Sequence, residues 1–553
     1  MGERMKRIYG IDLGTTYSSI AYIDEYGKPV VIPNLDNQRL TPSVVFFDGD
    51  AVIVGEVAKE SAKLYPEQVV GFIKRSMGEA NFLFEYAGKS YRPEEIASFI
   101  LRKLVQDAQQ SIGEVVSDVV ITCPAYFGIN EREATRVAGE IAGLNVRQIV
   151  NEPTAAAIAY GAVSAREPRT VLVYDLGGGT FDITMIGIRP EAVEVICTGG
   201  DHNLGGKDWD DRIVAYMVQE FQHLTKSQED ILEDPETWQD LQTSAEKCKK
   251  MLSQREQAPA AVTHAGKRVK MVLTREKFEE ITQDLLERTI WITHSMLDEA
   301  RKKGYPKFDE FILVGGLTRM PQVVARIRKE FEVEPKVFDP DEAIAKGAAI
   351  FGWKLSVNDD LVRRIAQKTS QDEDVVKAGM DLQSETVREA AKEMAEEIGY
   401  ELPAVEGALI SIQDVASKSF GVVAHNPENQ ELVFNLILRN TPVPAAAMKN
   451  FYTAVPNQKT VLVRIMESET SDGEISLQYG MQIGTVQLNL PAGMPADSPI
   501  EISFMLNKEG RLIMTAFESV GTRAINFTID TASVIQGKAL EEAKTRSQSL
   551  VVH

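Results

Sequence analysis

Two segments of the chain share one pattern, in which an apolar strand ends on an aspartate and a glycine–threonine turn leads into a second strand. The first is Asp12-Leu-Gly-Thr-Thr-Tyr17, and the second is Asp175-Leu-Gly-Gly-Gly-Thr-Phe-Asp182. Glycine lets the backbone turn sharply and approach a ligand, and the N–H and hydroxyl groups of such a turn can bind phosphate oxygens. One turn of this kind is an ordinary hairpin, but two copies predict two related lobes that hold one phosphate chain between them.

The two aspartates are expected to face each other across that phosphate chain. Carboxylates beside a polyphosphate need a cation, and Mg²⁺ suits such a site because it keeps several water ligands. A third glycine turn, Gly315-Gly316, follows an apolar strand and precedes Pro321, so its bare backbone can lie against a base or ribose. The stretch Gly199–Lys207 imitates a P-loop but lacks the first glycine and the final Ser or Thr. A Walker-type ATPase is therefore rejected.

The first 352 residues alternate between strand-like and helix-like runs, which predicts an α/β fold. Strands are predicted at 7–13, 18–23, 118–122, 171–175, 181–188 and 311–314, and helices at 96–108 and 131–142. Residues 353–407 are rich in Glu, Lys, Ala and Gln, and Val387, Ala391, Met394 and Ile398 recur at helical spacing. This segment is either a helical insert between two domains or a solvated spacer.

From residue 408 to 530 the apolar period falls to two. Apolar residues alternate at 432–438, 461–465 and 500–506, and Lys508-Glu-Gly510 is a hairpin turn after the last of these runs. The pattern predicts a mainly antiparallel β-sandwich. Residues 531–553 contain one short helical patch and a polar tail, which we expect to fray.

The net charge of -21 opposes sequence-independent binding to nucleic acid, because phosphates repel it. The three cysteines, Cys123, Cys197 and Cys248, form no Cys-x-x-Cys pair, so we expect buried thiols rather than disulfides or structural zinc. No apolar run is long enough for a transmembrane helix, and the first residues do not form a signal peptide. We expect a cytoplasmic protein that binds neither nucleic acid nor membrane.

Six motifs stand in order along the chain: Asp12-Leu-Gly-Thr-Thr16, Cys123-Pro-Ala-Tyr-Phe127, Asn151-Glu-Pro-Thr-Ala-Ala-Ala-Ile-Ala-Tyr-Gly161, Asp175-Leu-Gly-Gly-Gly-Thr-Phe-Asp182, Leu204-Gly-Gly206 and Asp339-Pro-Asp-Glu-Ala343. Together they resemble the DnaK-type chaperones, the seventy-kilodalton heat-shock family. The resemblance runs through residues 7–352 and resumes at 408–530. It implies an actin-like two-lobe ATPase domain (1–352), a helical insert or linker (353–407) and a β-sandwich domain that binds peptides (408–530), with Mg-ATP or Mg-ADP and K⁺ as cofactors.

The resemblance also implies roles for individual residues of the nucleotide site. Lys74 would orient the attacking water and neutralise charge on the γ-phosphate, Thr180 would lie near that phosphate, and Glu152 would sense the nucleotide. Asp12 and Asp175 would hold Mg²⁺ through water, and Asp182 would help to bind a monovalent cation. The nucleotide would contact Asp12, Gly14, Thr15, Thr16, Tyr17, Gly177, Gly178, Gly179, Thr180, Gly205, Gly206, Lys207, Glu246, Lys249, Lys250, Ser253, Gly315, Gly316, Arg319 and Asp341.

Two further groups of residues follow from the resemblance. The residues Pro124, Arg132, Pro153 and Asp414 would relay the nucleotide state between domains. In the β domain, Val422, Phe451, Ala454 and Val461 match positions that line the family's peptide groove, although apolar residues of a β domain also form plain core.

The chain departs from the family pattern in several places. Lys74 and Pro124 lie closer together than in the family, so a piece of the first lobe that meets nucleotide-exchange factors is expected to be missing. The linker Ala408-Leu-Ile-Ser-Ile-Gln-Asp414 is more polar than the family's leucine-rich linker, which leaves open whether it transmits the ATP signal. Leu317 and Lys207 replace the usual residues beside the base and the ribose. Residues 531–553 are too few for a helical lid, so bound peptide is expected to leave quickly.

Three functions remain open on the sequence. The first is an ATP-driven chaperone whose partners are unfolded or extended client polypeptides, and the resemblance adds a J-domain co-chaperone and a nucleotide-exchange factor. The second is a nucleotide-dependent adaptor that docks one partner through residues 353–406 or the β domain. The third is another actin-like ATPase, such as a filament former or a sugar kinase, and the added β domain argues against it.

Overall fold

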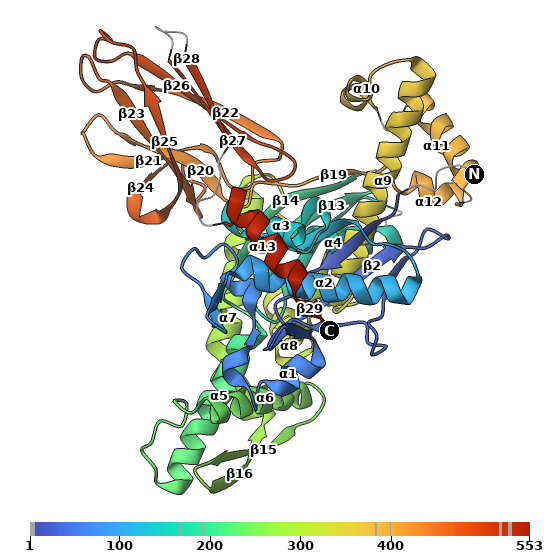
Figure 1. The fold of residues 1–553 in the computed structure, drawn as a ribbon, viewed down its shortest axis with the longest axis vertical. Helices are drawn as coiled ribbons and strands as arrows, with labels where there is room; N and C mark the ends of the chain where they lie inside the picture. Colours follow the sequence, from blue (N-terminus) through green and yellow to red (C-terminus); the bar gives the residue numbers. More distant parts are fainter. Residues whose placement is uncertain are drawn as a thin grey trace.

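The fold is known from a computed structural model, which describes residues 6–164, 167–190, 192–381, 384–398, 400–518, 523–528 and 534–553. It is a mixed α/β structure with several separate sheets (Figure 1). The predicted α/β class is confirmed at this level. Among the described residues, no helix is long and apolar enough to cross a membrane. The three cysteines are free and buried, as expected.

The first six-stranded sheet, called here the N-terminal sheet, carries the first glycine–threonine turn. Its strands run in the order β11-β10-β1-β2-β3, with β4 paired to β2. They are β1 Ile8–Asp12, β2 Tyr17–Ile23, β3 Pro29–Ile32, β4 Thr41–Pro42, β10 Asp118–Cys123 and β11 Asn145–Asn151. Alternate residues of β1 face opposite sides, because Ile8 and Ile11 belong to different core clusters. Gly10 is required here, since a Cβ atom would lie 2.1 Å from the backbone nitrogen of Ala349.

The second six-stranded sheet, called the central sheet, carries the second glycine–threonine turn. Its order is β18-β17-β12-β13-β14-β19. The strands are β12 Arg169–Leu176, β13 Phe181–Arg189, β14 Ala192–Asp201, β17 Glu310–Val314, β18 Lys336–Val337 and β19 Ser411–Gln413. β19 comes from the linker and runs parallel to β14, with Ala192 opposite Ser411. The linker is therefore part of this sheet.

Two helices lie between these sheets, and others cover their outer faces. Residues of α4 (Glu152–Ser164) and α9 (Ala343–Thr369) share one core cluster with one face of each sheet. The outer face of the N-terminal sheet packs on α2 (Pro93–Ile112) and α3 (Ile129–Ile141). That of the central sheet packs on α5 (Gly206–Thr225), α7 (Arg275–Lys302) and α8 (Pro321–Phe331). This layering sets the two glycine–threonine turns beside one another.

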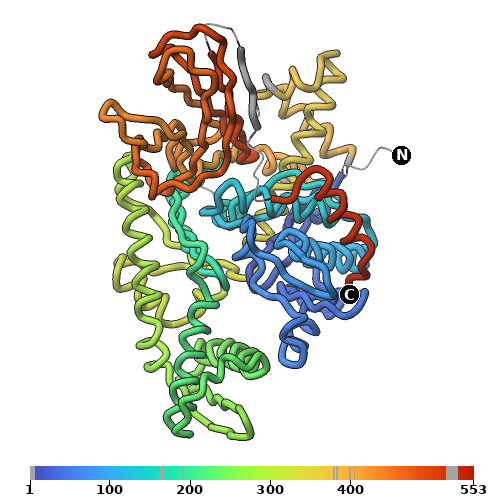
Figure 2. The backbone as a smooth tube through the Cα atoms, turned by 60° about the vertical axis from the view of Figure 1, so that its left-hand side comes forward, coloured from blue at the N-terminus to red at the C-terminus, as the bar shows by residue number. Residues whose placement is uncertain are grey.

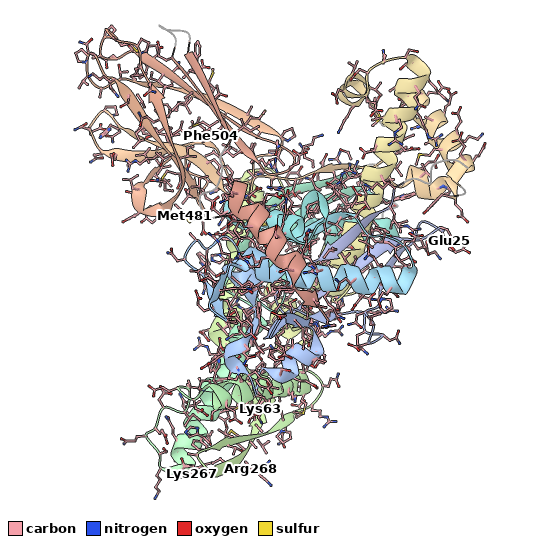
Figure 3. All side chains as sticks on the ribbon, viewed as in Figure 1. Glu25, Lys63, Lys267, Arg268, Met481 and Phe504 are labelled. Atoms are coloured by element: carbon pink, nitrogen blue, oxygen red, sulfur yellow. The ribbon has the colours of Figure 1, made fainter. Side chains whose placement is uncertain are left out.

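Smaller elements extend the two halves. A second sheet on the N-terminal side contains β5 Val44–Asp48, β6 Ala51–Val54 and β7 Val69–Gly71, and α1 Glu56–Ser61, β8 Phe84–Tyr86 and β9 Lys89–Tyr91 lie nearby in the chain. On the other side, α6 Pro235–Leu252 is followed by the hairpin of β15 Gln257–His264 and β16 Lys267–Thr274. Figure 3 shows Lys267 and Arg268 at the tip of this hairpin, at the far end of the molecule from Phe504.

The helical insert was expected to begin at residue 353, but that boundary falls inside α9, which continues to Thr369. The insert then contains α10 (Glu373–Gly379), α11 (Glu385–Ile398) and α12 (Leu402–Glu406). Val387, Ala391 and Met394 are buried, as their helical spacing predicts. They belong to the same core cluster as α4 and α9, and α10 and α11 contact α9, so this segment is packed onto α9 and is not a solvated spacer.

Residues 419–518 and 523–528 form two further antiparallel sheets, called here the paired sheets. One has the order β24-β21-β20-β23-β25 and the other the order β22-β26-β27-β28. The strands are β20 Ser419–His425, β21 Glu431–Ile437, β22 Ala445–Tyr452, β23 Thr460–Ser468, β24 Glu474–Ser476, β25 Gly480–Asn489, β26 Pro499–Leu506, β27 Leu512–Glu518 and β28 Arg523–Thr528. Alternate residues of β26, such as Phe504, point into a core that both sheets share. Gly510 closes the predicted β26–β27 turn with a φ of 78°.

The expectation that the last residues fray is wrong for 534–553. Residues 531–533 lie outside the described residues. The helix α13 (Gly537–Ser549) lies across α2 and α3, and β29 (Val551–Val552) pairs with β6 (Figures 1 and 2). Val534, Leu550 and Val552 are buried in the core under the N-terminal sheet. The segment was misread because its apolar residues follow no single period.

The paired sheets contact α3, which covers the N-terminal sheet, through a buried carboxylate. Glu467 of β23 accepts a hydrogen bond from the Ile129 backbone N–H at 3.2 Å, at the start of α3. A Cβ atom on Gly128 would lie 2.3 Å from Glu467 Oε1, so glycine is needed for this contact. Burial and the charge of Glu131 raise the pKa of Glu467 to about 7, against the opposing charge of Lys418.

This shift predicts a pH dependence. The folded protein favours protonated Glu467, so stability should fall as the pH rises from about 4.5 to about 7 and stay low above that. Glu467→Gln keeps the hydrogen-bond acceptor without the charge. We expect it to raise stability at pH 8 by on the order of 3 kcal/mol and to change little near pH 4.5. Thermal unfolding of both proteins from pH 4.5 to 8 tests this.

Glu469→Gln is the matched control. Burial would raise the pKa of Glu469, but Lys418, Tyr126 and Arg439 together outweigh it and hold that pKa below its usual range, so this variant should not change the slope between pH 5 and 8. Parallel stability curves for wild type and Glu467→Gln would contradict the prediction.

Candidate functional site

A cavity of about 1250 Å³ lies between the two glycine–threonine turns. Its walls contain most of the residues expected at the nucleotide site: Asp12, Gly14, Thr15, Thr16, Tyr17, Lys74, Glu152, Asp175, Gly177, Gly178, Thr180, Gly206, Glu246, Lys249, Lys250, Ser253, Gly315, Gly316, Arg319 and Asp341. Gly179 and Gly205 pack against each other just behind the wall. The structure therefore brings together segments more than three hundred positions apart, from residue 12 to residue 341.

The two turns touch each other at one end of the cavity. A Cβ atom on Gly178 would lie 1.9 Å from Thr16 Oγ1, and one on Gly179 would lie 2.4 Å from Thr15 Oγ1. A larger residue at either glycine would force the turns apart. The glycines of the second motif are thus required for the close approach of the two halves.

Four carboxylates gather at the floor of the cavity or just behind it: the half-buried Asp12 and the buried Glu152, Asp175 and Asp182. Burial first, and then the charge of Glu152, raise the pKa of Asp12 to about 7 and that of Asp182 to about 7. The same two causes, with Asp182 and Asp12 adding to them, hold the pKa of Asp175 well above its usual range. Asp182 lies opposite Asp175 in the β12–β13 ladder and accepts a hydrogen bond from the Tyr126 backbone N–H at 3.1 Å. This concentration of negative charge favours a cation.

Lys74 is the cation that the chain itself supplies. It belongs to a short 3-10 turn, Ile73–Ser76, and pairs with Glu152 at the start of α4; both side chains are nearly fully buried. Burial alone would lower the pKa of Lys74, but the charges of Glu152 and Asp12 outweigh it and raise the pKa. The ammonium group is therefore held charged at the cavity wall.

The remaining carboxylate oxygens fit a hydrated metal ion. Within the described part of the chain, Asp175 Oδ2 is buried and accepts no hydrogen bond. Among these residues no three acidic, histidine or cysteine side chains form a direct metal cage. Two carboxylates that contact an ion through water, as Mg²⁺ prefers, agree with both observations.

A charged cluster closes the outer part of the cavity. Lys59 of α1 pairs with Glu246 of α6 at 2.5 Å, and Lys250 donates a hydrogen bond to the Tyr17 hydroxyl at 2.8 Å. Lys249 donates to the Gly206 carbonyl at 2.8 Å, and Arg319 pairs with Asp341. The helical spacing of positions 246, 249, 250 and 253 predicted that these four share one face, and the first three belong to this cluster. Lys59 was missed, because nothing in its local sequence marks it.

Arg75 is a second residue that the sequence did not indicate. It donates to the Gly179 carbonyl at 2.7 and 3.0 Å and to Asp208 at 2.5 Å, so it bridges the two halves. Its only signal was its place beside Lys74. Lys207, expected near the ribose, is not among the residues that line the cavity; it pairs with Asp211 and lies near the rings of Phe72 and Trp238.

A chain of polar contacts leads from the cavity to the linker. Arg132 donates to Asn151, and Asn151 donates to Asp414 Oδ2 at 2.7 Å. Burial, against the charge of Arg132, raises the pKa of Asp414. Asn151 precedes Glu152 and Pro153, and Pro124 follows β10 one residue after Cys123. Asn151 was not singled out, although it stands first in its motif.

The four residues expected at a peptide groove do not share one environment. Val422 is fully buried in the core between the paired sheets, whereas Ala454 is exposed. Phe451 and Val461 are partly buried and pack against that core. Phe451 lies edge-on to Phe434, with ring centroids 6.0 Å apart. Val422 therefore lies in the core of the paired sheets, which was the alternative to a place in the peptide groove.

Comparison with known proteins gives a consistent result. Residues 8–366 match the family model described as Hsp70 protein. The chain is 35% identical over 555 residues to the proteins named Chaperone protein DnaK from two strains of Halobacterium salinarum. Each alignment covers 98% of this chain and 78% of the relative.

The buried pair predicts the effect of a substitution on stability. Lys74→Met removes the ammonium and leaves Glu152 among three other carboxylates, which should cost about 3–5 kcal/mol in the protein without nucleotide. Lys74→Met with Glu152→Gln should recover most of this loss. Denaturant unfolding measures both.

Lys63→Met is the control, because Lys63 forms an exposed pair with Asp240 and should contribute at most about 1 kcal/mol. An equal stability of Lys74→Met and wild type would show that the pair does not hold the cavity floor.

Proposed function

The chain belongs to the Hsp70 protein family, and on that premise we propose that it is a cytoplasmic, ATP-dependent molecular chaperone that hydrolyses Mg-ATP and binds extended apolar polypeptide segments. The observation that carries the proposal is the contact of the two glycine–threonine turns around one cavity with acidic groups and a buried lysine at its floor. Such a cavity suits a triphosphate with a bound cation.

We assign the parts of the chain accordingly. Residues 1–352 would be the actin-like two-lobe ATPase domain, with the N-terminal and central sheets as the cores of the two lobes. Residues 353–407 would be the helical linker segment, and 408–530 the β-sandwich that binds peptide. The shared core of α4 and α9 between the two sheets supports the first assignment, and the shared core of the paired sheets supports the last.

The residues at the cavity floor would carry hydrolysis. Asp12 and Asp175 would hold hydrated Mg²⁺, which neutralises charge on the phosphates, and Asp182 would help to hold K⁺. Glu152 fixes the Lys74 ammonium by direct pairing, so Lys74 would be ready to orient water beside the γ-phosphate without reorganisation. Thr180 lines the same cavity and would position that phosphate.

The outer cluster would bind the nucleoside. Glu246 and Lys250 lie on one face of α6, with Ser253 at its C-terminal end, and Gly315 and Gly316 add bare backbone to the cavity wall. The close pairing of Lys59 with Glu246 would close the cavity over the adenosine. Leu317 packs in the core of the central sheet and also lines the cavity, so it would offer the base an apolar contact.

The contact between Asn151 and Asp414 supports communication between the domains. The linker is more polar than the family's leucine-rich linker, yet its strand β19 pairs with the central sheet. Asp414 of the linker also accepts a hydrogen bond from Asn151, which precedes Glu152. A shift of Glu152 upon hydrolysis would move the adjacent Asn151, and the hydrogen bond of Asn151 to Asp414 would pass this movement to the linker. Pro153, Pro124 and Arg132 flank this route. A client polypeptide, a J-domain co-chaperone and a nucleotide-exchange factor are the partners that we propose.

A nucleotide-dependent adaptor is the second candidate, favoured by one observation. Val422 is buried in the core rather than open to a peptide, so the paired sheets could dock one partner instead of many clients. Binding to an array of extended apolar peptides separates the two functions. Binding of many peptides supports the chaperone, and binding of none while Mg-ATP still binds supports the adaptor.

Thr180→Ala tests the catalytic proposal. Loss of a hydroxyl that contacts the transferred phosphate should lower ATP turnover by on the order of 10²-fold, while affinity for Mg-ADP stays within a few-fold. Phosphate release and calorimetric titration measure the two quantities. Thr263→Ala on exposed β15 is the control and should change neither. Failure of wild type to bind Mg-ATP would refute the whole proposal.

Asp414→Ala tests the route between the domains. Without the carboxylate, Asn151 loses its acceptor on the linker, so an apolar peptide should no longer stimulate ATP turnover, whereas basal turnover should stay within a few-fold. Asp472→Ala, an exposed loop residue, should keep the stimulation. Full stimulation in Asp414→Ala would place the route elsewhere.

A further inference from the structure

Residues 534–553, called here the strap, follow the paired sheets in sequence but pack on the N-terminal side of the molecule. The strap runs across α2 and α3 and ends beside β6 (Figure 2). Its buried apolar side chains belong to the same core cluster as β1, α2 and α3: Val534, Ile535, Ala543, Leu550 and Val552. The strap therefore completes a hydrophobic core rather than lying on a surface.

Polar contacts fix the strap at several points along its length. Arg102 of α2 donates to the carbonyls of Ser547 and Leu550, the latter at 3.1 Å. Arg546 pairs with Glu95.

At the end of the strap, two backbone hydrogen bonds join it to the neighbouring strand. The His553 N–H donates to Val52 O, and the Val54 N–H donates to His553 O, both at 2.9 Å. These bonds extend the β5–β6 sheet by one strand.

The contacts of the paired sheets with β14 and α7 are polar. Asn440 accepts from the Thr198 N–H at 2.9 Å and donates to Glu299 at 2.5 Å, and Arg439 donates to the Thr198 carbonyl at 2.5 Å. A cavity of about 490 Å³ remains where α3, the β26–β27 turn and the start of the strap meet. Polar groups such as Asn440 can exchange their partners for water, whereas release of the strap would expose core side chains.

The chain length between the two attachments sets a limit. Six Cα–Cα steps join Thr528, the end of β28, to Val534, the first described residue of the strap, and an extended chain spans at most about 3.6 Å per residue. We propose that the strap is a tether that keeps the end of β28 within about 22 Å of the N-terminal sheet when the polar contacts open. The paired sheets would then be held at both ends, through β19 and through the strap.

Distances between two spin labels test the tether in the full chain. The three cysteines are buried, so labels can be attached at Val115→Cys, an exposed position after α2, and Glu509→Cys, in the turn next to the end of β28. Arg439→Ala with Asn440→Gly would loosen the polar contacts, and glycine tolerates the positive φ of 62° at position 440.

The decisive variant lengthens the connection without touching the strap. Twenty Gly and Ser residues inserted between Asp530 and Thr531 add a reach of about 25 Å. In the loosened protein, we expect the label distance to grow by no more than about 22 Å without the insertion, and to spread beyond that limit with it. The same insertion after Gly266, in the open β15–β16 turn, should have no effect.

Three results would overturn the proposal. The loosened protein without the insertion would exceed the limit if the strap did not hold, and the loosened protein with the insertion would stay compact if other contacts held the paired sheets. Leu550→Asp places a charge in the core and should release the strap, so in the loosened protein it should lengthen the distance as the insertion does. Lys538→Ala, at an exposed position of α13, should not. An unchanged distance in Leu550→Asp would also refute the strap.

Discussion

The buried ion pair of Lys74 and Glu152 is the contact on which the arrangement of this cavity depends. It joins the turn after β7 to the start of α4, and it lies among Asp12, Asp175 and Asp182. A lysine in such a place stays charged only because carboxylates surround it, and the carboxylates tolerate one another better because the lysine is there. Either charge alone would be expensive to bury. The cavity floor therefore forms as a unit, and the glycine contacts between the two turns bring its parts together.

Much of this could be predicted from the sequence, because the signals for it are local. A strand that ends on aspartate, turns on glycine and resumes after threonine was recognised at both sites, and β1–β2 and β12–β13 lie within a few residues of the predicted bounds. Strict alternation likewise identified the inward face of β26. In each case a few consecutive residues contain the whole pattern, because successive side chains of a strand point to opposite faces of the sheet.

The parts that could not be predicted depend on contacts between distant residues. The change of composition near residue 353 marks a change in what α9 packs against, not the end of a helix. Lys59 pairs with Glu246 of the cavity wall only because α1 meets α6 in the fold. In residues 534–553 the apolar side chains contact α2, α3 and β6 in turn, so no single period describes them and the segment read as a polar tail. Tertiary context, rather than local propensity, decided all three.

The paired sheets are attached to both halves of the proposed nucleotide domain, and this changes what the linker has to do. On one side β19 joins the central sheet, and on the other Glu467 meets the start of α3 while residues 534–553 extend the sheet that contains β6. Any change in the cavity that moves one half against the other must therefore act on the paired sheets from two directions. A polar linker would carry only part of that signal. An allosteric change limited to small displacements at Asn440 and Glu467 would then be enough to alter the paired sheets without their full separation, because bistable packing at an interface can amplify small shifts.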